Sequence, residues 1–145
     1  MAKLGLEVNE HLEALRSGFL KEPYASLFGI ELLEIEPGRA LVRMAPSPDL
    51  CNLFGVMHGG AIFSLIDAAF EAAANSHGTV AVALNVGVNY VSPASLEDAL
   101  FAEAREVSRS RRISTYSIQA RDEEGKIIAT CQATAYRKDD PIPSL

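Results

Sequence analysis

A glycine-containing triplet and one carboxylate are the residues of this sequence best suited to chemistry. His58, Gly59 and Gly60 stand directly before a run of strong helix formers, and Asp67 lies within that run. The first backbone N–H groups of a helix have no partner inside it and lie at its positive end, so they favour a negative charge that develops on a ligand. Glycine lets a ligand approach this backbone without meeting a Cβ atom. The triplet is equally compatible with a plain turn at the start of the helix, in which His58 packs on its neighbours.

The expected helix, residues 60–77, carries few polar side chains, and these share one arc of its circumference. They are Ser64, Asp67, Glu71 and Asn75. The arc either faces water or lines a site. The other residues are apolar, so we expect the helix to be almost enclosed, which would remove water from Asp67 and raise its pKa unless it has a partner. Such a carboxylate is suited to act as a base or a nucleophile.

His58 and Asp67 are too far apart to serve one small site within one chain. If the helix begins near His58, their spacing corresponds to about 180° around the axis and ~13 Å along it. Either one of the two residues is irrelevant to the chemistry, or a second subunit completes the site. A shared site explains both residues and makes a dimer part of the functional hypothesis.

The segments around this helix predict an α+β fold. Two short runs, 30–36 and 40–44, precede it and are joined by a Pro-Gly-Arg turn. Four strand-like runs follow, at 80–91, 99–107, 113–121 and 127–136, and their short turns favour antiparallel neighbours. The helix should end at a Gly78 cap, with His77 capping the negative end or exposed there. One antiparallel sheet must then cover one apolar helix.

Length and composition predict one domain of 145 residues, with 1–23 as an N-terminal helical extension centred on 11–15 and 139–145 as a flexible tail. No run approaches the ~18 uncharged apolar residues of a membrane span, and residues 1–7 do not resemble a secretory signal. We therefore expect a cytoplasmic protein that does not bind membranes. The two cysteines, Cys51 and Cys131, suggest neither a metal site nor a disulfide framework.

A net charge of −6 argues against nonspecific nucleic-acid binding, which needs a basic surface. An anionic ligand would have to be held by local cations. Four arginines gather around one turn, namely Arg105, Arg109, Arg111 and Arg112. This turn is either a ligand contact or a solvated hairpin tip.

The spacing of these residues resembles a known family. Asn52, five residues, His58-Gly59-Gly60, six residues and Asp67, followed by Asn89-Tyr90-Val91-Ser92-Pro93-Ala94, is similar to the hotdog-fold thioesterases of the phenylacetic-acid-degradation (PaaI-like) type. The resemblance runs from about residue 24 to 137. It implies a hotdog fold, in which a curved antiparallel β-sheet wraps a long central helix. It also implies a homodimer that forms the active site and a homotetramer of two dimers.

The same resemblance implies hydrolysis of an acyl-coenzyme A thioester to a free acid and coenzyme A. The Gly59 N–H would polarise the thioester carbonyl, with His58 and Asn52 positioning that loop and the thioester. Asp67 of the facing subunit would be the nucleophile or the general base. No separate cofactor is implied, because coenzyme A is part of the substrate. The remaining implied substrate contacts are Gly60, Asn89, Ser92, Pro93, Arg109, Arg111 and Arg112.

Two positions depart from the family pattern. Relatives often place a hydroxyl residue after the aspartate, where this chain has Ala68, and others have a serine where Ala83 stands. Both departures bear on rate and substrate range. Three alternatives stay open: a hotdog enoyl-coenzyme A hydratase, a non-catalytic module that binds or senses acyl-coenzyme A, and a purely structural role.

Overall fold

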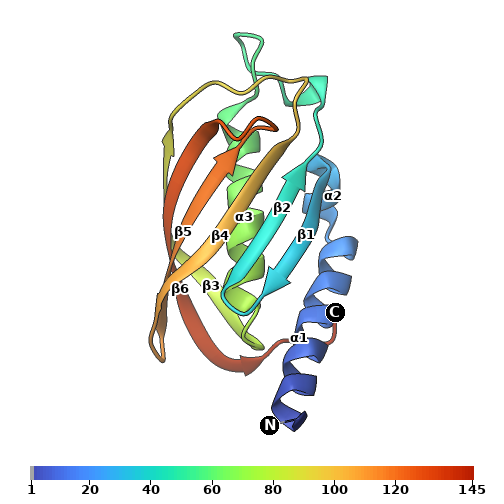
Figure 1. Cartoon of the computed structure of the whole chain (residues 1–145), viewed down its shortest axis with the longest axis vertical. Coiled ribbons are helices and arrows are strands. Elements are labelled where there is room, and N and C mark those ends of the chain that lie inside the picture. Colours follow the sequence, from blue (N-terminus) through green and yellow to red (C-terminus); the bar gives the residue numbers. More distant parts are fainter. Residues whose placement is uncertain (1) are drawn as a thin grey trace.

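Six strands form one antiparallel sheet that curves around a single long helix (Figure 1). The computed structural model describes the backbone of residues 2–145 and side chains from residue 9 onward. The helices are α1 (Ala2–Lys21), α2 (Pro23–Phe28) and α3 (Gly59–Asn75), and a short 3-10 turn spans Pro48–Leu50. The strands are β1 (Ile30–Glu36), β2 (Arg39–Met44), β3 (Thr79–Tyr90), β4 (Leu100–Arg109), β5 (Ile113–Arg121) and β6 (Ile127–Pro141). Their order in the sheet is β1-β2-β4-β5-β6-β3, which confirms the predicted hotdog architecture.

Most predicted strand bounds agree with the structure to within two residues, and the largest differences are at the two ends of the chain. The predicted N-terminal helix is longer than expected and reaches Lys21, while Met1 lies outside the described residues. β6 continues to Pro141, so the first residues of the expected tail are strand. The last residue lies against α1, where a Cβ atom on Gly18 would be 2.7 Å from the Leu145 side chain. Glycine at this position therefore allows the close approach of the tail to α1.

The core lies between α3 and the inner face of the sheet. Large α3 side chains such as Leu65, Ile66 and Phe70 are almost fully buried, and each contributes about 1.5–3 kcal/mol by leaving water. Phe70 meets the Tyr116 ring edge-on, with ring centroids 5.4 Å apart. Many inward-facing strand positions are alanine, which makes room for a helix inside the curve. They include Ala40, Ala102, Ala104, Ala120, Ala133 and Ala135.

The first turn of α3 is capped by the histidine of the triplet. His58 is in the extended conformation, with φ −63° and ψ 137°, and its Nδ1 atom accepts a hydrogen bond of 2.8 Å from the Gly60 N–H. This bond satisfies one of the helix-start amides that have no intrahelical partner. His58 is therefore the residue that defines where α3 begins.

The end of α3 differs from the prediction. The helix stops at Asn75, and Ser76 rather than Gly78 is the C-cap. The Ser76 hydroxyl donates to the Ala73 carbonyl oxygen at 2.7 Å and accepts from the Gly38 N–H at 2.7 Å, which ties the helix end to the β1–β2 turn. Gly78, with φ +87°, then turns the chain towards β3.

His77 is neither exposed nor a helix cap. Its Nε2 atom lies 2.7 Å from the Glu106 carboxylate on β4, which also accepts a hydrogen bond of 3.0 Å from the Tyr116 hydroxyl. Burial lowers the pKa of His77. The prediction failed because nothing local to His77 indicates that Glu106 packs against it.

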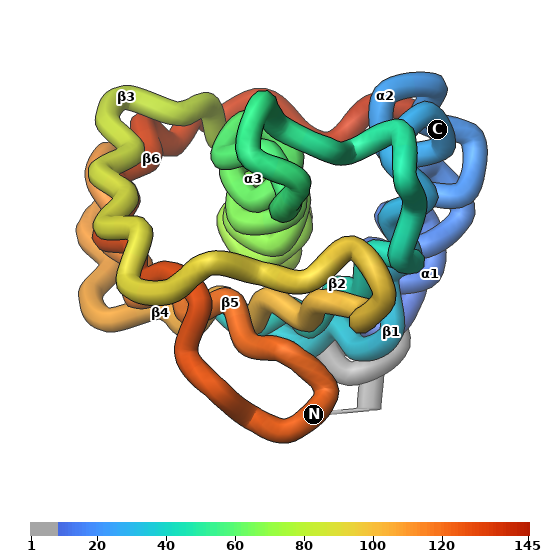
Figure 2. Tube along the Cα trace, turned by 90° about the horizontal axis from the view of Figure 1, so that it is seen from above, coloured from blue at the N-terminus to red at the C-terminus, as the bar shows by residue number. Residues whose placement is uncertain are grey.

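The molecule is most open along β3 and one face of α3, where Phe63 and Glu71 are exposed and Asp67 is partly exposed; we call this its open side. Seen nearly end-on in Figure 2, α3 occupies the centre, with β3 on one side and α1 and α2 on the other. β3 is the last strand of the sheet, so its outer row of N–H and C=O groups has no strand partner within the described chain. Val82 and Leu84 on this strand are exposed. Within residues 2–145, no helix is long and apolar enough to cross a membrane.

Candidate functional site

The amides at the start of α3 are not equivalent. The Gly60 N–H is already bonded to His58, and the Ala61 N–H donates to the His58 carbonyl oxygen at 3.0 Å. The Gly59 N–H has no hydrogen-bond partner among the described residues. It lies at the positive end of the helix, where it can donate to an oxygen that gains negative charge. Gly59, and not Gly60, is therefore the candidate oxyanion donor.

Tyr90, the last residue of β3, covers this glycine. Its hydroxyl donates to the Gly59 carbonyl oxygen at 3.0 Å, and a Cβ atom on Gly59 would lie 3.4 Å from its ring. Sequence reasoning named the neighbouring Asn89 instead. Side chains alternate along a strand, so Asn89 points to the face of the sheet opposite Tyr90 and away from α3. Within one chain, Asn89 is not part of the Gly59 site.

A small groove brings several of the predicted residues together. It has a volume of about 290 Å³ and is bounded by Asn52, Gly59, Ser92 and Pro93, with Tyr90 among its walls. The Asn52 Oδ1 atom accepts hydrogen bonds from the Phe54 N–H (2.8 Å) and the Val56 N–H (3.2 Å). Asn52 thus holds the turn that borders the groove.

The turn held by Asn52 exposes two large apolar side chains. Leu53 is 97% exposed and Phe54 is 86% exposed. Removing such side chains from water is favourable, so this turn is a surface that a partner can stabilise by covering it.

Asp67 lies on the open side of α3 and is half-buried. Burial raises the pKa of its carboxyl group, as expected from its position among apolar residues. Cys131 of β6 lies near Asp67. Burial, together with the Asp67 charge, raises the pKa of its thiol to about 11. Asp67 is ~12 Å along the helix axis from Gly59, so one chain does not bring the two together.

Two of the four residues in the polar arc of α3 serve the fold. The Ser64 hydroxyl donates to the Gly60 carbonyl oxygen at 2.9 Å and is 2.9 Å from the Tyr24 hydroxyl. The Asn75 Oδ1 atom accepts from the Ala81 N–H at 2.8 Å and so joins α3 to β3. Asp67 and Glu71 are left as the arc's candidates for chemistry.

A third carboxyl group, which sequence reasoning missed, joins this pair. Glu22 lies between α1 and α2 with its carboxyl group close to Glu71, and burial raises the pKa of Glu22. Burial, followed by the charges of Glu22 and Asp67, raises the pKa of Glu71 to about 7. No sequence signal links Glu22 to α3, since only the packing of α1 and α2 places it there.

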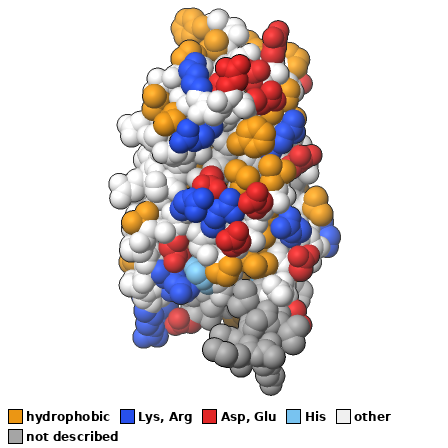
Figure 3. Space-filling model, viewed as in Figure 1, with side chains coloured by type: hydrophobic (Ala, Val, Ile, Leu, Met, Phe, Trp, Pro, Cys, Tyr) orange, Lys and Arg blue, Asp and Glu red, His pale blue; other side chains and the backbone are white. Residues whose placement is uncertain are grey.

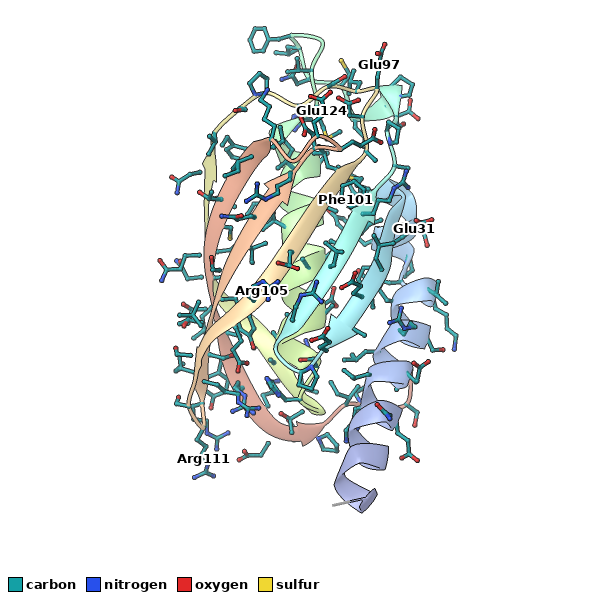
Figure 4. The ribbon with its side chains drawn as sticks, in the orientation of Figure 1. Glu31, Glu97, Phe101, Arg105, Arg111 and Glu124 are labelled. Carbon is teal, nitrogen blue, oxygen red and sulfur yellow. The ribbon has the colours of Figure 1, made fainter. Side chains whose placement is uncertain are left out.

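The arginine turn lies at the opposite end of the sheet from Gly59 within one chain. Figure 4 shows Arg111 at the β4–β5 turn, far from Glu97 and Glu124 at the other end. Arg111 and Arg112 both contact Asp139, at 3.4 and 2.9 Å, and the Arg109 Nε atom is 3.7 Å from Glu106. These arginines are therefore partly neutralised in the isolated chain.

The outer face of the sheet mixes charges of both signs. Figure 3 shows basic and acidic side chains side by side on this face. Glu103 illustrates the pattern, because its carboxylate contacts Arg39 and Arg105, each at 2.6 Å. Among the described residues, no group of three or more His, Cys, Asp or Glu side chains is arranged to hold a metal ion.

The raised pKa of Glu71 predicts a pH-dependent stability. Folding favours the protonated Glu71 carboxyl group. Its contribution to the stability of the folded state is therefore full below the ordinary pKa of 4.5 and is lost as pH rises through about 7. Glu71→Gln cannot ionise, so it removes the free-energy cost of holding a charged carboxylate at this partly buried position at high pH. We expect its Tm to exceed the wild-type value by about 2–4 °C at pH 8 and to differ little at pH 5, an effect of ~1 kcal/mol after allowance for solvent screening.

Calorimetry at the two pH values checks this prediction. Glu124→Gln, which changes an exposed carboxyl in the β5–β6 turn, is the control and should show no such difference. An equal Tm change at both pH values for Glu71→Gln would contradict the prediction.

Comparison with known proteins identifies the family of this chain. The model of the Thioesterase superfamily matches residues 54–129, which contain the triplet and Asp67. The acyl-coenzyme A thioesterase PaaI of Escherichia coli is 30% identical over 113 residues, which cover 78% of this chain and 81% of that protein. A protein of Archaeoglobus fulgidus is 38% identical over 117 residues, covering 81% of this chain and 76% of the relative. The solved structure of E. coli PaaI has a TM-score of 0.88 at 26% identity and covers 93% of this chain and 98% of its own. The chain therefore belongs to the thioesterase superfamily, as an enzyme of the PaaI-like hotdog type.

Proposed function

We propose that this enzyme hydrolyses acyl-coenzyme A thioesters, with Gly59 of one subunit and Asp67 of another in each active site. The observation that carries the proposal is the unpartnered Gly59 N–H at the start of a helix whose open side bears a partly desolvated carboxylate. The similarity to the E. coli acyl-coenzyme A thioesterase supports the substrate class.

In this proposal the Gly59 N–H donates a hydrogen bond to the thioester carbonyl oxygen. The bond strengthens as the carbonyl carbon becomes tetrahedral and the oxygen gains negative charge. One such donor is worth about 10²–10³-fold in kcat. His58 and Tyr90 hold the peptide in place, because His58 occupies the competing Gly60 N–H and Tyr90 bonds the Gly59 carbonyl. Asn52 positions the adjoining loop.

Asp67 supplies the basic or nucleophilic step. As a general base it takes a proton from water while the water oxygen bonds to the carbonyl carbon; the C–S bond then breaks and the sulfur receives that proton. As a nucleophile its oxygen forms an anhydride with the acyl carbon and expels the thiolate, and water then hydrolyses the anhydride. Both routes yield a carboxylic acid and coenzyme A.

A homodimer brings the two residues together. Antiparallel pairing of two β3 edges about a two-fold axis extends the sheet across both subunits and reverses one relative to the other. The reversal directs the start of one α3 towards the middle of its partner. The same contact removes Val82 and Leu84 from water, together with the exposed turn at Leu53 and Phe54. The family resemblance extends this proposal to a homotetramer of two such dimers.

The reversed pairing also gives the arginine turn a role. It carries Arg109, Arg111 and Arg112 of the partner towards the end of the sheet where this subunit's α3 begins. Guanidinium groups bind phosphate oxygens in pairs, and coenzyme A carries a diphosphate and a phosphorylated ribose. Phosphate binding there displaces Asp139 from Arg111 and Arg112.

Removing the Asp67 charge should abolish turnover without unfolding the protein. Asp67→Asn keeps the size of the side chain, and we expect kcat for thioester hydrolysis to fall at least ~100-fold with KM little changed. Thiol release measures the rate, and sedimentation shows whether the oligomer persists. Glu71→Gln, one turn further on the same face, is the matched control and should lose far less. Near-normal turnover by Asp67→Asn would remove Asp67 from the mechanism.

The Gly59 N–H can be deleted with little disturbance. Proline suits the first helical position, and His58 already has the extended conformation that a following proline requires. We expect Gly59→Pro to lose about 10²–10³-fold in kcat. Gly59→Ala adds the same contact with Tyr90 but keeps the N–H, so it should retain more activity.

Mixing these variants tests whether the site is shared. Refolding Asp67→Asn and Gly59→Pro together in equal amounts gives about half heterodimers, each with one intact site of two. The mixture should therefore recover about a quarter of the wild-type activity, whereas each variant alone has almost none. No recovery in a mixture that sedimentation shows to contain heterodimers would place both groups within one chain and refute the shared site.

The arginine turn should matter only to substrates that carry the nucleotide. Replacing both Arg111 and Arg112 by Ala should raise KM for acyl-coenzyme A about 10-fold or more, because two charge-assisted contacts are lost. KM for the same acyl group on a truncated thiol without the nucleotide should not change. Equal effects on the two substrates would make the turn a solvated hairpin tip.

A further inference from the structure

An apolar cavity of about 510 Å³ lies beside the polar arc of α3. It is open to solvent on one side and lies between α1, the second half of α3, the start of β3 and the C-terminal segment. Its apolar walls include Leu15, Phe19, Ala72, Val80, Ile142 and Leu145. A site with mostly apolar walls and a few polar groups at its rim is typical of a pocket for an apolar ligand.

Contacts between distant parts of the chain shape this cavity. The Ile142 N–H donates to the Gly78 carbonyl oxygen at 3.2 Å, which directs the chain end from β6 towards α1. Leu145 then packs on Gly18, and Asn75 fixes the start of β3 against α3. The cavity is thus a built feature of the fold.

The cavity begins one helical turn beyond Asp67 on the same face of α3. Glu71 and Asn75 line it, and both belong to the polar arc that contains Asp67. Glu71 follows Asp67 by one turn, ~6 Å along the helix. An acyl chain whose carbonyl carbon lies at Asp67 and which runs along this arc therefore passes Glu71 and reaches the apolar walls.

We propose that this cavity binds the distal part of an aliphatic acyl chain, so that the enzyme prefers medium-length or longer straight-chain acyl groups over acetyl groups. The inference rests on the proposed function and adds its substrate class. Two of the elements that form the cavity, α1 and the segment after β6, lie outside residues 54–129, the part that matches the family model, whereas α3 and the start of β3 lie within it.

A series of straight-chain acyl-coenzyme A substrates tests the proposal. For the wild type, kcat/KM should rise about three- to fourfold for each methylene that enters the cavity. Leu15→Trp fills the cavity and should lower kcat/KM for the preferred chain at least ~10-fold, while the value for acetyl-coenzyme A stays within about twofold. Leu20→Trp places the same side chain at a position of α1 that is 79% exposed, and should change neither value.

A second variant covers the case in which tryptophan impairs folding. Leu15→Ala deepens the same cavity and should move the preferred substrate to a longer chain. A wild type whose kcat/KM does not depend on chain length, or a Leu15→Trp effect equal for all chains, would overturn the cavity proposal alone. Dissociation of the Leu15→Trp oligomer would also overturn it, by assigning the cavity to a subunit contact. A wild type that hydrolyses no acyl-coenzyme A refutes the proposed function itself.

Discussion

Enclosure of α3 by the sheet is the constraint on which the other features depend. A helix can lie within the curve of one sheet only if the facing side chains leave room for it, and alanine at many inward positions of β2, β4, β5 and β6 provides that room. Both ends of the helix are then held by specific polar contacts. His58 satisfies the Gly60 N–H at one end, and Ser76 links the other end to Gly38.

This enclosure is incomplete along one strip, and the strip contains the groups suited to catalysis. Asp67 and Glu71 are the acidic residues of the largely apolar helix α3, and partial burial raises both pKa values, with the charges of Glu22 and Asp67 adding to the effect at Glu71. The outer edge of β3, the last strand of the sheet, has no strand partner among the described residues. The strip and this edge together form the surface that a second subunit can cover. In the proposed dimer, the surface that pairs with the second subunit is also the surface that carries Asp67.

The ends of the chain add a further layer beside this strip. Glu22, between α1 and α2, lies near Glu71, and α1 forms one wall of the apolar cavity. The carboxyl pair therefore stands where the polar arc meets the apolar wall. A charged pair would be costly next to a buried aliphatic chain, whereas the protonated form of Glu71, with its pKa of about 7, carries no such cost near neutral pH. Glu71 thus stands between Asp67, the proposed catalytic carboxylate, and a region suited to apolar groups.

Local patterns were sufficient to predict the six strands, α1 and α3, but not α2 or the short 3-10 turn. Alternation and turn residues placed the strands, helix-forming residues placed α3, and the spacing from Asn52 to Asp67 indicated the family. Such signals depend on neighbouring residues, so the sequence displays them directly.

Only the tertiary structure could decide how these elements use their side chains. The preference for the Gly59 N–H depends on the rotamer of His58, and the contact of Tyr90 with Gly59 depends on how the end of β3 meets the start of α3. Glu22 and Glu106 reach α3 and His77 through packing between segments that are remote in sequence. Local periodicity determines which residues form a helix or a strand, whereas long-range packing determines which polar groups lose water and which partner each one meets.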